Sequence, residues 1–155
     1  MLLLVLTQAL ILNNMHLFGL VTPFLYTYLL LKFNADMSRY ALLFWGFFIG
    51  LFVDIFSNTL GINAAATTLL AFLRPLLLRI FTPRDSSDDF TPGILSMGTW
   101  SFIYYVGIAT LLHQTALILL EAFSFAHLGI LLLKITAGTL LTTICFYAID
   151  RIKKK

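Results

Sequence analysis

The chain has 155 residues, of which 60% are hydrophobic and 11% charged, with a mean hydropathy of +0.96 and a net charge of +3. A soluble domain has about 45–50% apolar and about 25% charged residues. This composition excludes a soluble fold, because the leucine runs and fifteen phenylalanines would leave large apolar patches in water. The positive charge lies in short connecting segments and in the C-terminal tail, so membrane topology explains it better than nucleic-acid binding does.

Six apolar stretches follow one another along the chain. They cover residues 2–12, 17–33, 41–57, 62–81, 94–120 and 125–149. A transmembrane helix needs about 20 mostly apolar residues, and lipid requires that backbone polar groups are satisfied within the protein. We therefore expect an all-α integral membrane protein with one domain over residues 1–155, formed by a bundle of six transmembrane helices. A bundle of five is the alternative, because residues 1–33 are short for two spans. Thr91 and Pro92 are expected to open the fifth helix as its N-cap and first residue.

The basic residues predict how the bundle is oriented. They gather in three places: Lys32 and Arg39, then Arg79 and Arg84, then Arg151, Lys153, Lys154 and Lys155. These places fall on one side of the membrane if the helices alternate, and the positive-inside rule makes that side cytoplasmic, together with the C-terminus. The aromatic residues expected at the same interface are Tyr26, Tyr28, Tyr40, Trp45, Trp100, Tyr104, Tyr105 and Tyr147.

Asp54 is the most informative residue, because a carboxylate inside an apolar span costs about 2.5–3.5 kcal/mol. Gly46 and Gly50 precede it at steps of four, so the three residues share one helix face. The glycines permit close approach of a neighbouring helix. We expect this face to point inward, against the small-residue helix that begins near Ala64.

Lys134 is the expected ion-pair partner of Asp54, since both residues lie a few positions below the outer ends of their helices. Arg74 is expected about 15 Å closer to the cytoplasmic side than Asp54. We expect its side chain to extend toward the cytoplasmic surface beside a kink at Pro75. A buried pair that fixes packing and a partner-binding or ion-coupling role remain alternatives for Asp54. The structural or partner-binding candidates are Gly46, Gly50, Asp54, Asn58, Gly61, Asn63, Arg74 and Lys134.

The sequence contains no hydrolase, zinc-protease or phosphate-loop motif. His16, His113 and His127 do not have metal-ligand spacing, and the single cysteine, Cys145, is expected to pack in a helix. We therefore expect a non-enzymatic protein with no catalytic, cofactor-binding or metal-binding residues and no cofactor.

The segment from Trp45 to Ala66 resembles the rod shape-determining protein MreD family. That family carries a G-L-x-x-D block, a short polar turn with glycine, and a small-residue helix. Here these features correspond to Gly50, Leu51 and Asp54, then Gly61, then Ala64. The Asn13–Gly19 segment, Pro23, the length and the basic tail also resemble members from the Bacteroidetes group.

The resemblance implies a scaffold subunit of the bacterial cell-elongation (rod) complex in the inner membrane, which supports cell-shape control and peptidoglycan synthesis. Its implied partners are MreC, bound through membrane helices, and the MreB filament, a class B penicillin-binding protein and a SEDS glycosyltransferase in the same complex. The family fold is similar to the substrate-binding subunits of energy-coupling-factor transporters, so a vitamin-binding subunit is the alternative function. We expect the transmembrane helix of MreC to pack on an exposed face of small and aromatic residues, whose shape the Asp54 hairpin determines.

Overall fold

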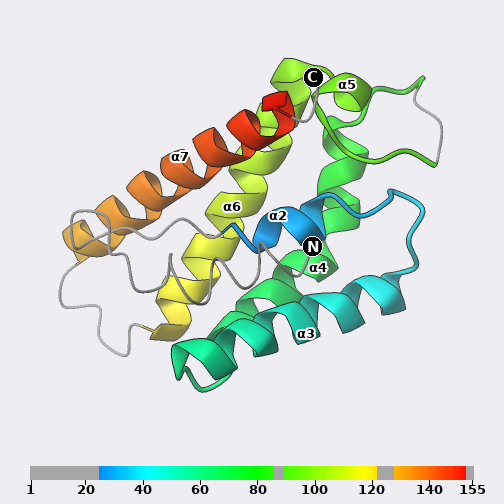
Figure 1. Cartoon of the computed structure of the whole chain (residues 1–155). Coiled ribbons are helices and arrows are strands. Elements are labelled where there is room, and N and C mark those ends of the chain that lie inside the picture. The colour runs from blue at the N-terminus through cyan, green and yellow to red at the C-terminus, as the bar shows by residue number, and fades with distance from the viewer. Residues whose placement is uncertain (1–24, 86–88, 122–127, 153–155) are drawn as a thin grey trace.

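The computed structural model describes residues 25–85, 89–121 and 128–152, and within them every regular element is a helix (Figure 1). The helices are α2 (Thr27–Leu31), α3 (Arg39–Ser57), α4 (Ile62–Phe81), α5 (Ile94–Met97), α6 (Thr99–Glu121) and α7 (Leu128–Ile152). The first expected span, and the second as far as residue 24, lie outside the described residues. Of the second expected span, the described part contains the short helix α2.

Four of these helices are long and apolar enough to cross a membrane: α3, α4, α6 and α7 from Gly129 onward. The all-helical class and the multi-pass character expected from the sequence are therefore present in the described residues. The longest helix, α7, has 25 residues and extends over about 37 Å, compared with the ~30 Å of a bilayer's hydrocarbon core.

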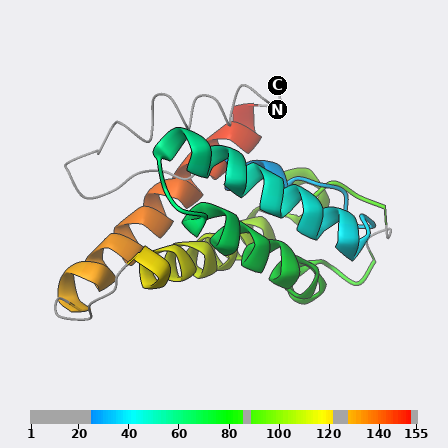
Figure 2. The same cartoon turned by 90° about the horizontal axis from the view of Figure 1, so that it is seen from below.

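The long helices form a sequential bundle. α3 and α4 form a hairpin, α4 packs against α6, and α6 packs against α7. In Figure 1, α3 and α7 lie at opposite sides of the bundle, and α2 contacts α3 and α4 between them. Figure 2 shows the α3–α4 hairpin side by side with α6. The main core cluster joins α2, α4, α6 and α7 through buried residues such as Leu30, Leu70, Phe102 and Phe146.

The hairpin between α3 and α4 depends on two residues with left-handed backbone conformations. Asn58 ends α3 with a φ of 54°, and Gly61 precedes α4 with a φ of 79°. Asparagine and glycine are the residues that adopt this conformation most readily. The other end of α3 is capped by Ser38, whose Oγ accepts a hydrogen bond of 3.3 Å from the backbone N–H of Ala41.

The stretch expected to form one helix over residues 94–120 contains a break. Gly98 has a φ of 85° and separates the four-residue α5 from α6. The expected opening at Thr91 and Pro92 was also wrong, since α5 begins at Ile94. The physical reason is tertiary: the N–H of Ile94 is bound by a carboxylate from α7, so no local cap is needed there.

Candidate functional site

The carboxylate of Asp54 is buried, with 2% of the residue exposed, and it accepts hydrogen bonds with both oxygens. Oδ1 accepts from the backbone N–H of Asn63 at 3.0 Å, from Asn63 Nδ2 at 2.9 Å and from the Thr59 hydroxyl. Oδ2 accepts from the backbone N–H of Ala64 at 2.8 Å. Four donors therefore surround one carboxylate, all of them from the hairpin turn and the start of α4.

Asp54 thus caps the next helix along the chain. Gly61 occupies the N-cap position of α4 but has no side chain to accept hydrogen bonds, so the N–H groups of the first turn need another acceptor. The carboxylate on α3 supplies it and also interacts favourably with the positive end of the α4 dipole. This arrangement explains how a carboxylate can be buried there with no cation from residues 25–85, 89–121 or 128–152 beside it.

The expected pair between Asp54 and Lys134 was wrong. Across residues 25–85, 89–121 and 128–152, the ion pair closer than 4 Å is the one between Lys32 and Asp150. Lys134 is half-buried in α7, whereas the Asp54 carboxylate is occupied by donors from α4 and its preceding turn. The error has a physical cause: helix N–H groups can stabilise a carboxylate, and a search restricted to charged partners does not consider them.

Gly46 and Gly50 face α4, as their spacing with Asp54 predicted. A Cβ atom on Gly46 would lie 2.7 Å from the Cβ of Ala71, and one on Gly50 would lie 2.5 Å from the Cα of Ala64. Real Cβ atoms do not approach other carbon atoms this closely. The glycines are therefore used inside the hairpin, so a partner protein does not meet them directly.

A buried polar network extends from Asp54 toward α6. The Tyr26 hydroxyl donates to Asn63 Oδ1 at 3.0 Å and lies 3.0 Å from His113 Nε2. The two rings meet edge to face, with centroids 5.6 Å apart. The network therefore joins α3, α4, the residue before α2, and α6 around a single tyrosine.

Three of the eight expected interfacial aromatic residues are core residues instead. Tyr26, Tyr28 and Tyr105 are at most 1% exposed, whereas Tyr40 and Trp100 are exposed as expected. Each buried hydroxyl binds an acceptor inside the bundle, which is why a tyrosine can occupy these positions.

A second carboxylate, Asp150, is buried at the other end of the bundle, and the sequence did not single it out. It pairs with Lys32 and accepts hydrogen bonds from the Tyr28 hydroxyl at 3.1 Å and from the backbone N–H of Ile94 at 2.8 Å. Lys32 also donates to the carbonyl oxygen of Pro92 at 2.7 Å. This cluster connects α2, the segment before α5, and the end of α7.

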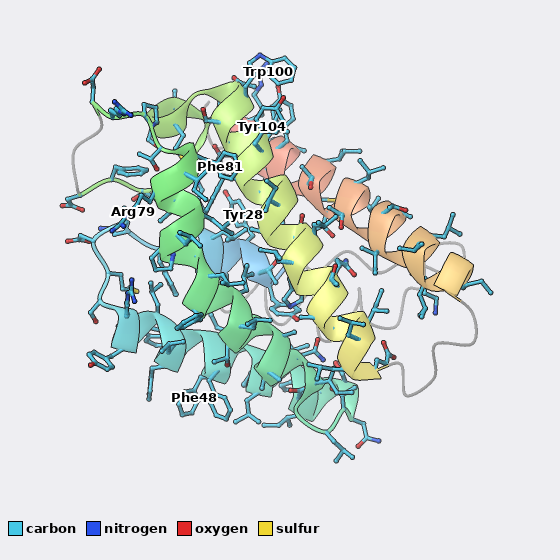
Figure 3. All side chains as sticks on the ribbon, turned by 180° about the vertical axis from the view of Figure 1, so that it is seen from behind. Tyr28, Phe48, Arg79, Phe81, Trp100 and Tyr104 are labelled. Atoms are coloured by element: carbon cyan, nitrogen blue, oxygen red, sulfur yellow. The ribbon has the colours of Figure 1, made fainter. Side chains whose placement is uncertain are left out.

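The segments that carry the first and third groups of basic residues meet at this end, together with the loop after α4. The N–H of Ala35 donates to Phe90 O at 2.9 Å, and the Thr91 hydroxyl donates to Asn34 Oδ1 at 2.9 Å. Trp100 and Tyr104 project outward from the first turns of α6 (Figure 3). These contacts agree with the expectation that the basic segments share one side of the bundle.

Arg74 does not extend toward the surface, so that expectation was wrong. Its side chain is fully buried, and Nη2 donates to Leu31 O at 3.4 Å and to Phe33 O. These carbonyls belong to the C-terminal end of α2, where a cation interacts favourably with the helix dipole. Arg74 Nε and Nη1 are buried without a hydrogen-bond partner among the described residues.

Both carboxylates accept hydrogen bonds from groups inside the bundle, so the two sites hold helix ends in place. Among the described residues, no group of three His, Cys, Asp or Glu side chains is arranged to bind a metal ion. In comparisons with known proteins, no protein family, no curated protein and no solved structure matches this chain.

Proposed function

We propose that this chain is a non-enzymatic scaffold subunit of the MreD type, located in the bacterial inner membrane with its C-terminus in the cytoplasm. One observation carries the proposal: the residues that resemble the MreD family form one structural unit. Asp54 accepts the Ala64 N–H, Gly50 contacts Ala64, and Gly61 forms the turn between them. A short pattern whose members contact one another is a stronger resemblance than one made of scattered membrane residues.

The surface offered to a partner is the outer face of α3. Because the glycine face of α3 is covered by α4, the opposite face is left for binding, and it is rich in phenylalanine. The phenylalanine stripe comprises Phe44, Phe48, Phe52 and Phe56, all at least 36% exposed. Ring centroids are 4.5 Å apart in the first pair and 4.9 Å apart in the second. Phe48 points away from the bundle in Figure 3.

The outer face of α7 provides the contrast. Its large exposed side chains are aliphatic: Ile130, Leu132, Leu133, Leu140, Ile144 and Ile152. Aromatic side chains bury large areas and add ring contacts, and they concentrate at protein interfaces, whereas lipid tails need only an apolar surface. We therefore assign the phenylalanine stripe to the transmembrane helix of MreC, and α7 to lipid. MreB, the penicillin-binding protein and the SEDS glycosyltransferase would join through the same complex.

Co-purification from native membranes tests this assignment. Replacing Phe44 and Phe48 with alanine should lower MreC recovery about tenfold, because two buried aromatic contacts are worth about 1.4 kcal/mol or more. The matched control replaces Leu132 and Leu140 on α7 with alanine and should leave MreC recovery unchanged. Equal recovery with both double variants would contradict the assignment.

The vitamin-transporter alternative predicts different partners in the same preparation. A substrate-binding subunit should retain an ATPase module or a tightly held vitamin and should not retain cell-wall synthesis proteins. Mass spectrometry of the purified complex distinguishes the two functions directly. Recovery of the ATPase module without MreC would refute the scaffold proposal.

A further inference from the structure

A groove follows the side of α3 that faces α4, next to the phenylalanine stripe but separate from it. It consists of two hollows of about 600 and about 350 Å³, which share Leu43 and Phe72. The larger hollow has a floor of small residues, among them Gly61, Ala64 and Ala65. The smaller hollow continues the groove toward the start of α3.

The groove is apolar along its length and cationic at one end. The smaller hollow is lined by Ser38, Arg39 and Tyr40, the cap and first residues of α3. Arg39 is exposed and has no carboxylate within 4 Å among the described residues. Tyr40 is 87% exposed beside it. A guanidinium and a phenol at the start of a membrane helix are groups that reach the level of lipid headgroups.

The length and lining of the larger hollow fit a hydrocarbon chain. It extends beside the turn residue Gly61 and the first part of α4 as far as Phe72, a rise of about 16 Å. A flexible acyl chain can lie along this length, where the lining side chains offer it apolar contacts and include no charged group.

We propose that this groove binds an anionic phospholipid, with an acyl chain between α3 and α4 and the phosphate at Arg39. The hydrocarbon supplies the apolar match, and the headgroup supplies the negative charge that Arg39 does not obtain from a carboxylate of the described residues. The lipid would fill the space beside the hairpin that Asp54 and the glycines hold together. This site is independent of the scaffold assignment, since it uses a different face of α3.

Native mass spectrometry of the full chain, purified with a mixture of phosphatidylglycerol and phosphatidylcholine, tests the site. The wild-type protein should retain phosphatidylglycerol preferentially. Arg39→Gln should lower that preference about fivefold, because one basic residue near the membrane surface contributes about that factor. Arg151→Gln, which removes an exposed cation at the end of α7 that does not line the groove, should lower it clearly less than Arg39→Gln does.

A second pair of variants tests the groove itself. Ala65→Phe fills the larger hollow and should reduce retention of both lipids, whereas Ala148→Phe on the exposed face of α7 should not. Inorganic phosphate at millimolar concentration should not displace the lipid. An unchanged lipid preference in Arg39→Gln would overturn the proposal. So would displacement by free phosphate, or loss of a co-purified protein from Ala65→Phe while lipid retention stays constant.

Discussion

Asp54 and Asp150 are two buried carboxylates at opposite ends of the described bundle, and they are stabilised in different ways. Among the residues that the structure describes, Asp54 has no cation within 4 Å, and it relies on N–H and O–H donors from the turn and first residues of α4. Asp150 has the Lys32 ammonium group as well as an N–H group at the start of α5. Both carboxylates therefore satisfy the start of a helix that lacks its own side-chain cap.

The difference shows which segments of the chain each carboxylate connects. Asp54 acts within one hairpin, and its donors lie five to ten residues further along the chain. Asp150 acts between segments more than fifty residues apart, and it determines how α2, α5 and α7 meet. The first site shapes a local unit, and the second closes the bundle.

Removing the acceptor at the first site should have the largest effect. Asp54→Leu leaves the N–H groups of Asn63 and Ala64 buried without an acceptor, and each such donor costs about 1–3 kcal/mol. We expect the free energy of unfolding in mixed detergent micelles to fall by about 3–5 kcal/mol. Glu121→Leu, at an exposed carboxylate, is the control and should change it by less than 1 kcal/mol. Similar values for the two variants would contradict the capping role.

Removing the cation at the second site should have a smaller effect. Lys32→Met leaves the Asp150 carboxylate with its two remaining donors, so we expect a loss of about 2–3 kcal/mol. Combining it with Asp150→Asn should recover part of that loss, with a coupling energy of about 1 kcal/mol or more in a double-mutant cycle. Strictly additive losses would show that the two side chains do not act as a pair.

A substitution that keeps the shape of the Asp54 side chain but removes its charge separates the contribution of hydrogen bonding from that of charge. Asp54→Asn retains one acceptor oxygen and turns an NH₂ group toward a backbone donor, so we expect a loss of about 1–2 kcal/mol. The same unfolding titration should place this variant between the wild type and Asp54→Leu. A loss as large as that of Asp54→Leu would mean that charge, rather than hydrogen bonding, stabilises the site.

The smallest effect is expected for Lys134. Because this residue forms no ion pair with Asp54, Lys134→Met should change the unfolding free energy by less than about 0.5 kcal/mol. Its coupling with Asp54→Asn should be zero within error. A coupling energy above about 1 kcal/mol would show that Lys134 and Asp54 do form an ion pair, contrary to the geometry of the structure.

The sequence by itself determined the membrane class, the four long helices within a few residues, and the inward face of Gly46, Gly50 and Asp54. These follow from apolar length and helical periodicity, which are local properties of the chain. It also named Asn58 and Gly61 among the structural candidates, and the structure adds that both have the left-handed conformations that the turn between α3 and α4 requires.

Only the tertiary structure decided which groups meet. The cap at the start of α5 comes from a residue 56 positions away, and Arg74 is held by carbonyls 41 and 43 positions earlier. Periodicity shows which face of a helix is buried, but it does not show which helix end or which hydroxyl lies opposite. Within lipid, a buried charge is satisfied by whatever donor or acceptor the fold brings close, so its partner is decided by packing.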